Sequence, residues 1–201
     1  MDPLEAGARS VQATGLFETT ILTAKMPDAD SLNAALKRIV VEREAADAGV
    51  RRSNLDGWQS APDMLSAGWG GEAAVAVGQF ALGACNRYCR DLKMTDQPRF
   101  QWTADMWANV NRRGAANSNH VHPQAFWSAV YYVDDGYGGS DDRALGGELV
   151  FQDPRFPMNR MFSSEMVFLS SGGRPQHWFS TVRPQSGMLV AFPSWLFHSV
   201  E

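Results

Sequence analysis

Hydrophobic residues recur at helical spacing in two segments of the first half of the chain. In the first segment, four apolar positions lie three, four or one residue apart: Leu32, Leu36, Ile39 and Val40. This spacing is typical of the buried face of a helix. Asp and Ser residues before it can cap the helix, so we expect a helix over residues 31–48 that stops at Gly49. A second helix is expected over residues 72–93, where Ala, Val, Phe and Leu recur without proline.

From residue 100 onward the pattern changes to short β-branched and aromatic runs separated by Gly, Pro and Asp. Such runs are typical of strands joined by turns. We expect strands over residues 102–110, 126–133, 148–151, 166–169, 178–182, 188–192 and 195–200. Short strands with turns between them favour a sandwich, jelly roll or barrel. The sequence therefore predicts one domain over residues 1–201, in which a mainly helical part (1–98) supports a β-structure (99–201).

Composition narrows the class of protein. The chain has 201 residues, of which 44% are hydrophobic and 20% charged, as in an ordinary globular domain. Its net charge of −4 argues against a nucleic-acid partner. Its apolar runs are far shorter than the roughly 20 residues of a membrane span, and its N-terminus lacks the pattern of a signal peptide. Two cysteines are too few for a disulfide framework, so we expect a cytoplasmic protein.

All the histidines lie in the predicted β half: His120, His122, His177 and His198. His120 and His122 are two positions apart, so on a strand both imidazoles would lie on one face. With His198 from a distant strand they would form a set of three metal ligands that leaves coordination positions open. Open positions indicate catalysis, since structural zinc sites are usually closed by four protein ligands. On the residues alone, a surface pair or a hydrogen-bonded core histidine remains an alternative, and for His177 it is the preferred interpretation.

Cys85 and Cys89 are a rival source of metal ligands. They lie four apart on the second predicted helix, which usually means a packed face. A zinc site with two cysteines and two histidines would need this helix to reach the histidine strand. The spacing of the two cysteines is also not that of a zinc finger, so we favour packing.

From Trp107 to Val200 the chain resembles the 2-oxoglutarate- and Fe(II)-dependent oxygenase superfamily, and within it the bacterial and phage oxygenases of unassigned substrate. The resemblance rests on ordered segments at residues 119–123, 126–133, 146–155 and 184–198, with a Gly-Trp-Gln-Ser sequence at 57–60. It implies a mainly β fold, a double-stranded β-helix (jelly roll) buttressed by N-terminal helices. It also implies a dioxygenase that uses Fe(II), 2-oxoglutarate and O2 to hydroxylate an unknown substrate.

The resemblance assigns roles to particular residues. His120 and His198 match the two metal-binding histidines of the superfamily, and His122 occupies the position of its aspartate ligand. Tyr132 matches a tyrosine that touches 2-oxoglutarate in relatives similar to prolyl hydroxylases. The other candidates for cofactor binding are Ser128, Leu149 and Asn109. Asn119 and Trp107 flank the ligand strand, and for Trp107 and Trp195 simple core packing is an equally good interpretation.

Two features depart from the pattern of the superfamily. A third imidazole, His122, leaves the charge of an Fe(II) site unchanged, whereas the usual carboxylate lowers it by one. Three arrangements therefore stay open for the position of the usual carboxylate ligand. His122 could bind the metal there, a water could bind in its place, or the amide of Gln124 could occupy the position. The Arg or Lys that usually clamps 2-oxoglutarate, about nine residues after the last histidine, would fall beyond Glu201. Other cations must then be considered for this role, namely Arg112, Arg113 and Arg155.

Two further functions stay open on these grounds. One is a jelly-roll binding module that has lost catalysis, and the other is a cupin-like iron enzyme with three histidines that does not use 2-oxoglutarate. The substrate could be a small metabolite or a protein side chain. The Gly- and Asp-rich segment 137–147 is a candidate substrate lid or a simple connection.

Overall fold

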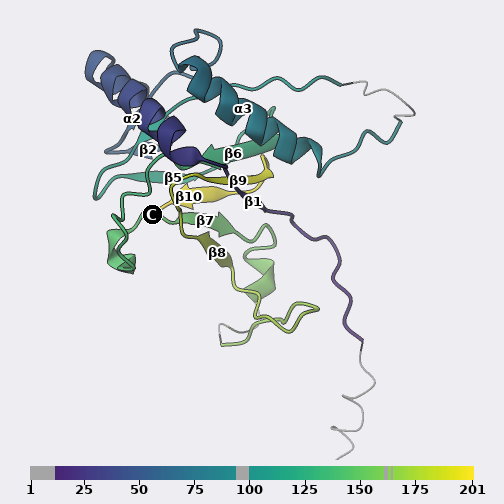
Figure 1. Cartoon of the computed structure of the whole chain (residues 1–201). Coiled ribbons are helices and arrows are strands. Elements are labelled where there is room, and N and C mark those ends of the chain that lie inside the picture. The colour runs from purple at the N-terminus through teal and green to yellow at the C-terminus, as the bar shows by residue number, and fades with distance from the viewer. Residues whose placement is uncertain (1–11, 94–99, 161–162, 164) are drawn as a thin grey trace, which may run out of the picture.

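The structure, a computed structural model, describes residues 12–93, 100–160, 163 and 165–201. The first part contains β1 (Leu22–Lys25), α2 (Ala29–Ala46), β2 (Asn54–Leu55), β3 (Trp58–Gln59) and α3 (Gly71–Asn86). The second part contains β4 (Asn109–Val110), β5 (Ala116–His120), β6 (Trp127–Tyr131), η1 (Arg143–Leu145), β7 (Leu149–Gln152), η2 (Met158–Arg160), β8 (Phe179–Val182), β9 (Met188–Pro193) and β10 (His198–Val200). Figure 1 shows the two long helices on one side of the strands.

Both predicted helices are present, with different ends. Asp28 stands at the N-cap of α2, but its backbone is left-handed and its side chain makes no capping hydrogen bond. The helix α3 ends at Asn86 rather than at residue 93. Beyond it Tyr88 and Leu92 are 64% and 95% exposed, so no buried apolar face is available to stabilise another helical turn.

The strands form two main antiparallel sheets. One has the order β1-β9-β6 and the other the order β2-β5-β10-β7-β8, with β3 and β4 forming a separate pair. The consecutive strands β9 and β10 belong to different sheets, so the chain crosses between the sheets at residues 194–197. A mainly β, jelly-roll type of sandwich with N-terminal helices is therefore confirmed. The N-terminal part, which was predicted to be mainly helical, also contributes a strand to each sheet: β1 belongs to the first sheet and β2 to the second.

Two strand predictions are wrong. Residues 166–169 form no strand, and only an isolated bridge joins Leu169 to Pro175. The strand expected at 102–110 is reduced to β4, whereas β5 lies in a segment that the pattern did not mark. The sequence of β5, Ala-Asn-Ser-Asn-His, has low β-propensity. It is a strand because it pairs with β10 and β2 on its two sides.

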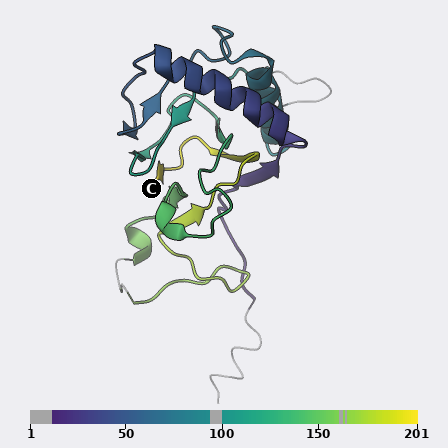
Figure 2. The ribbon, with the colours of Figure 1, turned by 60° about the vertical axis from the view of Figure 1, so that its left-hand side comes forward.

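The core between the sheets is apolar and closely packed. Its buried residues are Leu149, Phe151, Val190, Phe192 and Leu196. A second cluster joins the helices to the sandwich through Leu36, Met64, Ala74, Val77 and Ala108. The helices cover the β1-β9-β6 sheet, and Figure 2 shows that the excursion from β7 to β8 lies on the other side of the molecule. Neither described helix meets the length and hydropathy that a membrane span requires.

Candidate metal centre

Three histidines come together where strands β5 and β10 meet. His120 ends β5 and is paired in register with His198, which begins β10. His122 follows two residues after the end of β5. The ring centroids lie 4.3 Å apart for His120 and His198, 4.9 Å for His120 and His122, and 5.1 Å for His122 and His198. One nitrogen of each ring lies within 4.8 Å of the others, so the three histidines that the sequence singled out as candidate ligands do lie together.

Backbone carbonyls orient two of the rings. His120 Nδ1 lies 2.7 Å from the carbonyl oxygen of Ser118, and His198 Nδ1 lies 2.9 Å from that of Leu196. A carbonyl oxygen can only accept, so in each ring Nδ1 carries a proton and Nε2 is the nitrogen left to face an ion. Metal-binding histidines are typically held in this way, with one nitrogen tied to a carbonyl or carboxylate and the other free for the ion.

Burial favours the uncharged form of two of the imidazoles, those of His198 and His122. It lowers the pKa of His198 to about 4, helped by His120 and His122. Burial, followed by His120, also lowers the pKa of His122. Neutral imidazole is the form that binds a metal. An ion bonded to nitrogen at about 2.1 Å needs the ligand atoms within about 4 Å of each other, so the observed spacing requires only small ring movements. The donor set therefore fits a divalent transition metal.

Ser128, Val130 and Tyr132 share one face of the chain at β6. Ser128 and Val130 pair with Phe192 and Val190, and directly paired residues lie on the same face of a sheet. Val130 and Tyr132 pack against the core cluster between the sheets. Phe192 is in turn a ring neighbour of His198, at 4.6 Å between centroids. This face therefore continues from Tyr132 to the histidines.

The Tyr132 hydroxyl is buried and has no hydrogen-bond partner. Burial raises the pKa of this phenol well above its usual value, so it stays protonated and can donate. A buried, unpaired hydroxyl is costly, and a polar ligand group beside it would remove that cost. The Ser128 hydroxyl lies 2.7 Å from that of Ser194. The donors on this face thus fit an oxygen-rich cofactor such as 2-oxoglutarate.

The other predicted site residues are placed as follows. Leu149 is 1% exposed and part of the core wall. The ring of Trp107 lies 5.5 Å from that of His122. Asn119 is exposed and donates to Gln152 Oε1 at 2.7 Å. Asn109 is exposed on β4, opposite Gln59 in the small sheet, so the structure does not bring it to the inner face. Trp195 is 56% exposed, which excludes the core packing considered for it.

None of the three cations considered for clamping 2-oxoglutarate is placed for that role. Arg112 forms a two-pronged ion pair with Glu44 of α2. Arg155 binds Asp153 and Gln176 at 2.7 Å each. Arg113 is exposed on the β4–β5 turn. The structure therefore assigns the clamp to none of them.

The segment from Tyr137 to Gly147 is held in place by contacts that the sequence pattern did not reveal. The guanidinium of Arg183 lies 4.1 Å above the ring of Tyr137 and donates to the carbonyls of Ser140, Asp141 and Asp142. Tyr137 also donates to the carbonyl of Gly146 at 2.8 Å. The segment lies at the strand ends opposite the histidines, so its position does not favour the predicted role as a substrate lid.

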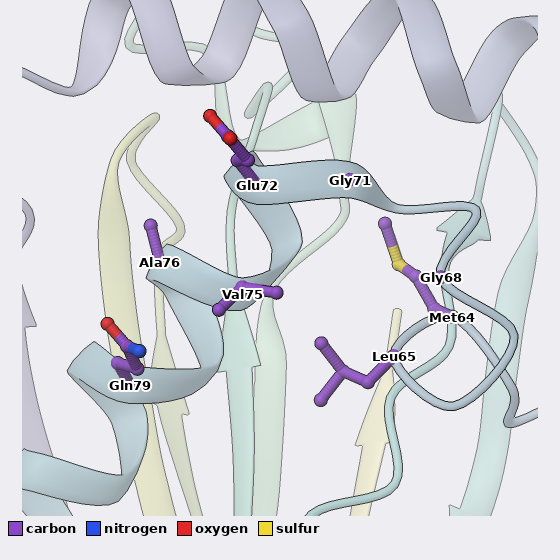
Figure 3. A pocket seen from close by; sticks show the side chains of 8 residues that line it. All are labelled: Met64, Leu65, Gly68, Gly71, Glu72, Val75, Ala76 and Gln79. Carbon is purple, nitrogen blue, oxygen red and sulfur yellow. The ribbon is translucent and has the colours of Figure 1, made fainter.

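The remaining candidates lie apart from the histidine cluster. Cys85 is buried, and burial raises the pKa of its thiol to about 11. Cys89 donates to the carbonyl of Cys85, and neither cysteine joins a metal-binding group among the described residues. His177 is exposed. A groove of about 350 Å³ runs between the loop at Met64 and the first turns of α3, with Val75 on its floor and Glu72 and Gln79 beside it. Figure 3 shows that it is formed on the helical side.

Comparison with known proteins agrees with this site. Residues 105–201 match a family described as "Putative 2OG-Fe(II) oxygenase". The fold is similar to a crystal structure of a Pseudomonas putida prolyl-4-hydroxylase, with a TM-score of 0.47 and 18% identity over 90% of this chain and 84% of that chain. No curated protein matches the sequence. The matched residues, just under half of the chain, contain all three clustered histidines and are similar to this family of oxygenases.

Proposed function

We propose that this protein is a 2-oxoglutarate- and Fe(II)-dependent dioxygenase that hydroxylates a substrate at the His120–His122–His198 cluster. The observation that carries the proposal is the convergence of three imidazoles, two of them oriented by backbone carbonyls. Three protein ligands leave coordination positions for other molecules. The family of the matched half supports the same activity.

Each residue group has a distinct task in this proposal. His120, His122 and His198 would hold the iron, and the carbonyls of Ser118 and Leu196 keep two of the rings oriented. The Tyr132 hydroxyl would donate to a carboxylate oxygen of 2-oxoglutarate, with the Ser128–Ser194 pair beside it. The core residues Leu149, Phe151 and Phe192 exclude water from this face. When bound, iron and 2-oxoglutarate supply the oxidising chemistry by which O2 is used.

A second candidate is an iron enzyme that uses the three histidines without 2-oxoglutarate. Its support is His122, an imidazole in place of the carboxylate that the superfamily normally supplies. The positive charge of Fe(II) is then not reduced by a protein ligand, which changes the electrostatics of whatever binds next to it. The two candidates differ in whether 2-oxoglutarate binds to the iron.

Anaerobic titration with Fe(II), with and without 2-oxoglutarate, tests the proposal. The chelate of iron and a keto acid should give a visible charge-transfer band, and succinate should form when O2 is admitted. Iron binding without the band would favour the three-histidine enzyme. Absence of iron binding would contradict both candidates and leave a binding module.

A further inference from the structure

Strand β8 is the outermost strand of the five-stranded sheet. It pairs with β7 on one side, and Figure 1 shows it as the last strand of that sheet. β8 begins at the edge of the sandwich that holds the histidine cluster, where β5, β7 and β9 end. We call this the histidine edge. The side of β8 that faces away from β7 is free along the strand.

The register with β7 determines which backbone groups point to this free side. The N–H of Asp153 donates to the carbonyl of Trp178 at 2.7 Å, and in an antiparallel pair every second residue bonds to the neighbouring strand. The N–H and C=O groups of Ser180 therefore point to β7, whereas those of Phe179 and Thr181 point away from it. Among the described residues these four groups have no backbone hydrogen-bond partner. Such groups are a template for pairing with another strand.

β8 lacks the features that usually prevent such pairing. Outer strands are protected by charged residues, proline, bulges or very short length. Residues 176–182 contain no Asp, Glu, Lys, Arg or Pro, and the register of β7 with β8 is regular. By contrast, β2 at the other side of the same sheet has two residues, and β1 at one side of the smaller sheet ends in Lys25. β8 is therefore open to a partner strand.

A second copy of β8 fits the free side in one register. When two antiparallel copies cross at Ser180, Phe179 of each copy lies opposite Thr181 of the other. The four free groups of each copy then form four hydrogen bonds between the copies. With a shift of the register in either direction, residues within β8 form only two such bonds. The free side of β8 is thus complementary to itself about a two-fold axis.

The side chains agree with this register. On the outer face of the sheet, each exposed Phe179 ring would lie beside an exposed Thr181, and aromatic and β-branched residues are a favourable cross-strand pair. The ring would also lie next to a hollow of about 380 Å³ that is lined in part by Val150, Phe179 and Thr181. At the axis the small side chains of the two Ser180 residues meet. No charged side chain of residues 176–182 opposes the contact.

We propose that this protein forms a two-fold symmetric dimer through antiparallel pairing of β8 with β8 of a second copy, with the axis at Ser180. The two five-stranded sheets become one continuous sheet. Because the paired strands are antiparallel, the two histidine edges lie at opposite ends of the joined sheet. A four-residue strand buries far less than the roughly 1,600 Å² of a standard interface. We therefore expect a dissociation constant on the order of 100 µM.

Sedimentation velocity on the metal-free protein, from about 1 to about 500 µM, tests the dimer without reference to the dioxygenase function. Thr181→Pro removes an N–H that points to the free side and does not bond to β7, so folding should be retained. Thr181→Val is the matched control, because it keeps the N–H and a β-branched side chain. The wild type and Thr181→Val should reach the mass of a dimer, and Thr181→Pro should dimerise at least about 10-fold more weakly.

Oxidative cross-linking tests the position of the axis. Ser180→Cys would place two thiols directly opposite each other in a non-hydrogen-bonded pair, close enough for a disulfide. Thr181→Cys is the control, because this residue is equally exposed but lies diagonally across from its own copy, about 7–8 Å away. Ser180→Cys should give a covalent dimer at least about 10-fold more efficiently. The wild type, with Cys85 and Cys89, gives the background.

Several results would overturn the proposal. A wild type that stays monomeric at every concentration would leave β8 to another kind of partner. An unchanged dimer in Thr181→Pro would place the contact on another surface, and oligomers larger than a dimer would contradict the closed two-fold pairing. Equal cross-linking of Ser180→Cys and Thr181→Cys, or none in either, would contradict the axis at Ser180.

Discussion

The two edges of the sandwich differ in their chemistry. The histidine edge carries exposed aromatic side chains such as Phe126 and Trp195, and one internal ion pair, Asp153–Arg155. The opposite edge carries the charged residues Asp134, Asp135, Asp141, Asp142, Arg143, Glu148 and Arg183. Its loop is held by hydrogen bonds and ion pairs, such as Lys37–Asp134 at 2.6 Å. The apolar surroundings at the histidine edge favour uncharged imidazoles. At the opposite edge, charged side chains such as Arg183 donate hydrogen bonds that hold the loop in place. Tyr132 follows β6 and packs against the core that lies between the two edges.

The largest expected effect is at the histidine edge. His198→Ala should abolish tight Fe(II) binding, with affinity reduced at least 100-fold, because two ligands hold a metal far more weakly than three. His177→Ala is the matched control, since His177 belongs to the same edge but is exposed and outside the cluster. Calorimetric titration with Fe(II) or Co(II) measures both. Equal affinities of the two variants would remove His198 from the site.

The neutral state of His198 predicts a pH dependence of stability in the metal-free protein. Its pKa in the folded chain is about 4, below the usual 6.5 of an unfolded histidine. The unfolded state therefore binds the proton more readily, and stability falls as the pH drops from about 6.5 towards 4. The full difference of about 2.5 pKa units corresponds to a cost on the order of 3 kcal/mol.

Urea unfolding at pH 7 and pH 5 measures this cost. Carboxylates also contribute to the pH dependence, so the comparison is with His198→Gln, which cannot titrate. The variant should lose less stability than the wild type between the two pH values. An identical loss in both proteins would show that His198 is not held neutral by its surroundings.

The next effect concerns the residue between the two edges. Tyr132→Phe removes a buried hydroxyl without a partner, so stability should be unchanged or slightly higher. The affinity of the iron-loaded protein for 2-oxoglutarate should fall about 10-fold, because the proposed donor is lost, while Fe(II) affinity stays the same.

Tyr131→Phe is the control for this variant. The Tyr131 hydroxyl donates to Asn33 Oδ1 of α2 at 2.7 Å, on the opposite face of β6. Its loss should cost about 1 kcal/mol of stability and leave 2-oxoglutarate affinity unchanged. If both variants bind 2-oxoglutarate equally well, Tyr132 is not a cofactor contact.

Local patterns predicted a β-rich half of the chain and the pairing of His120 with His122, whereas the jelly roll and the match of His198 to a metal ligand came from the resemblance to a known superfamily. The parity of Ser128, Val130 and Tyr132 follows from the alternation of a strand, and the structure shows the expected shared face. The polar strand β5 has no such signal, because its pairing with β10 and β2 depends on residues far away in the sequence. The end of α3 depends on where its apolar side chains stop being buried, and the spacing of apolar residues in the sequence does not show this.

Contacts between side chains that are distant in the sequence also could not be predicted from the pattern of apolar and polar residues. The hydrogen bonds from Arg183 to the 137–147 segment connect residues more than 40 positions apart. The ion pairs of Arg112 and Arg155 could not be foreseen either, and they remove two cations that the sequence left available. The hydroxyl pair of Ser128 and Ser194 could have been suspected from the two motifs that contain these serines.

The smallest expected effect is at the charged edge. Arg183→Ala removes a ring contact and hydrogen bonds to three carbonyls. Because Arg183 is partly exposed, the loss of global stability should be at most about 1 kcal/mol. Backbone amides of residues 138–146 should exchange hydrogen faster, with Arg113→Ala, another exposed arginine, as control. Fe(II) affinity should not change, because the histidines lie at the other edge. A loss of Fe(II) affinity in Arg183→Ala would mean that the 137–147 segment influences the histidine cluster, and that the two edges do not act separately.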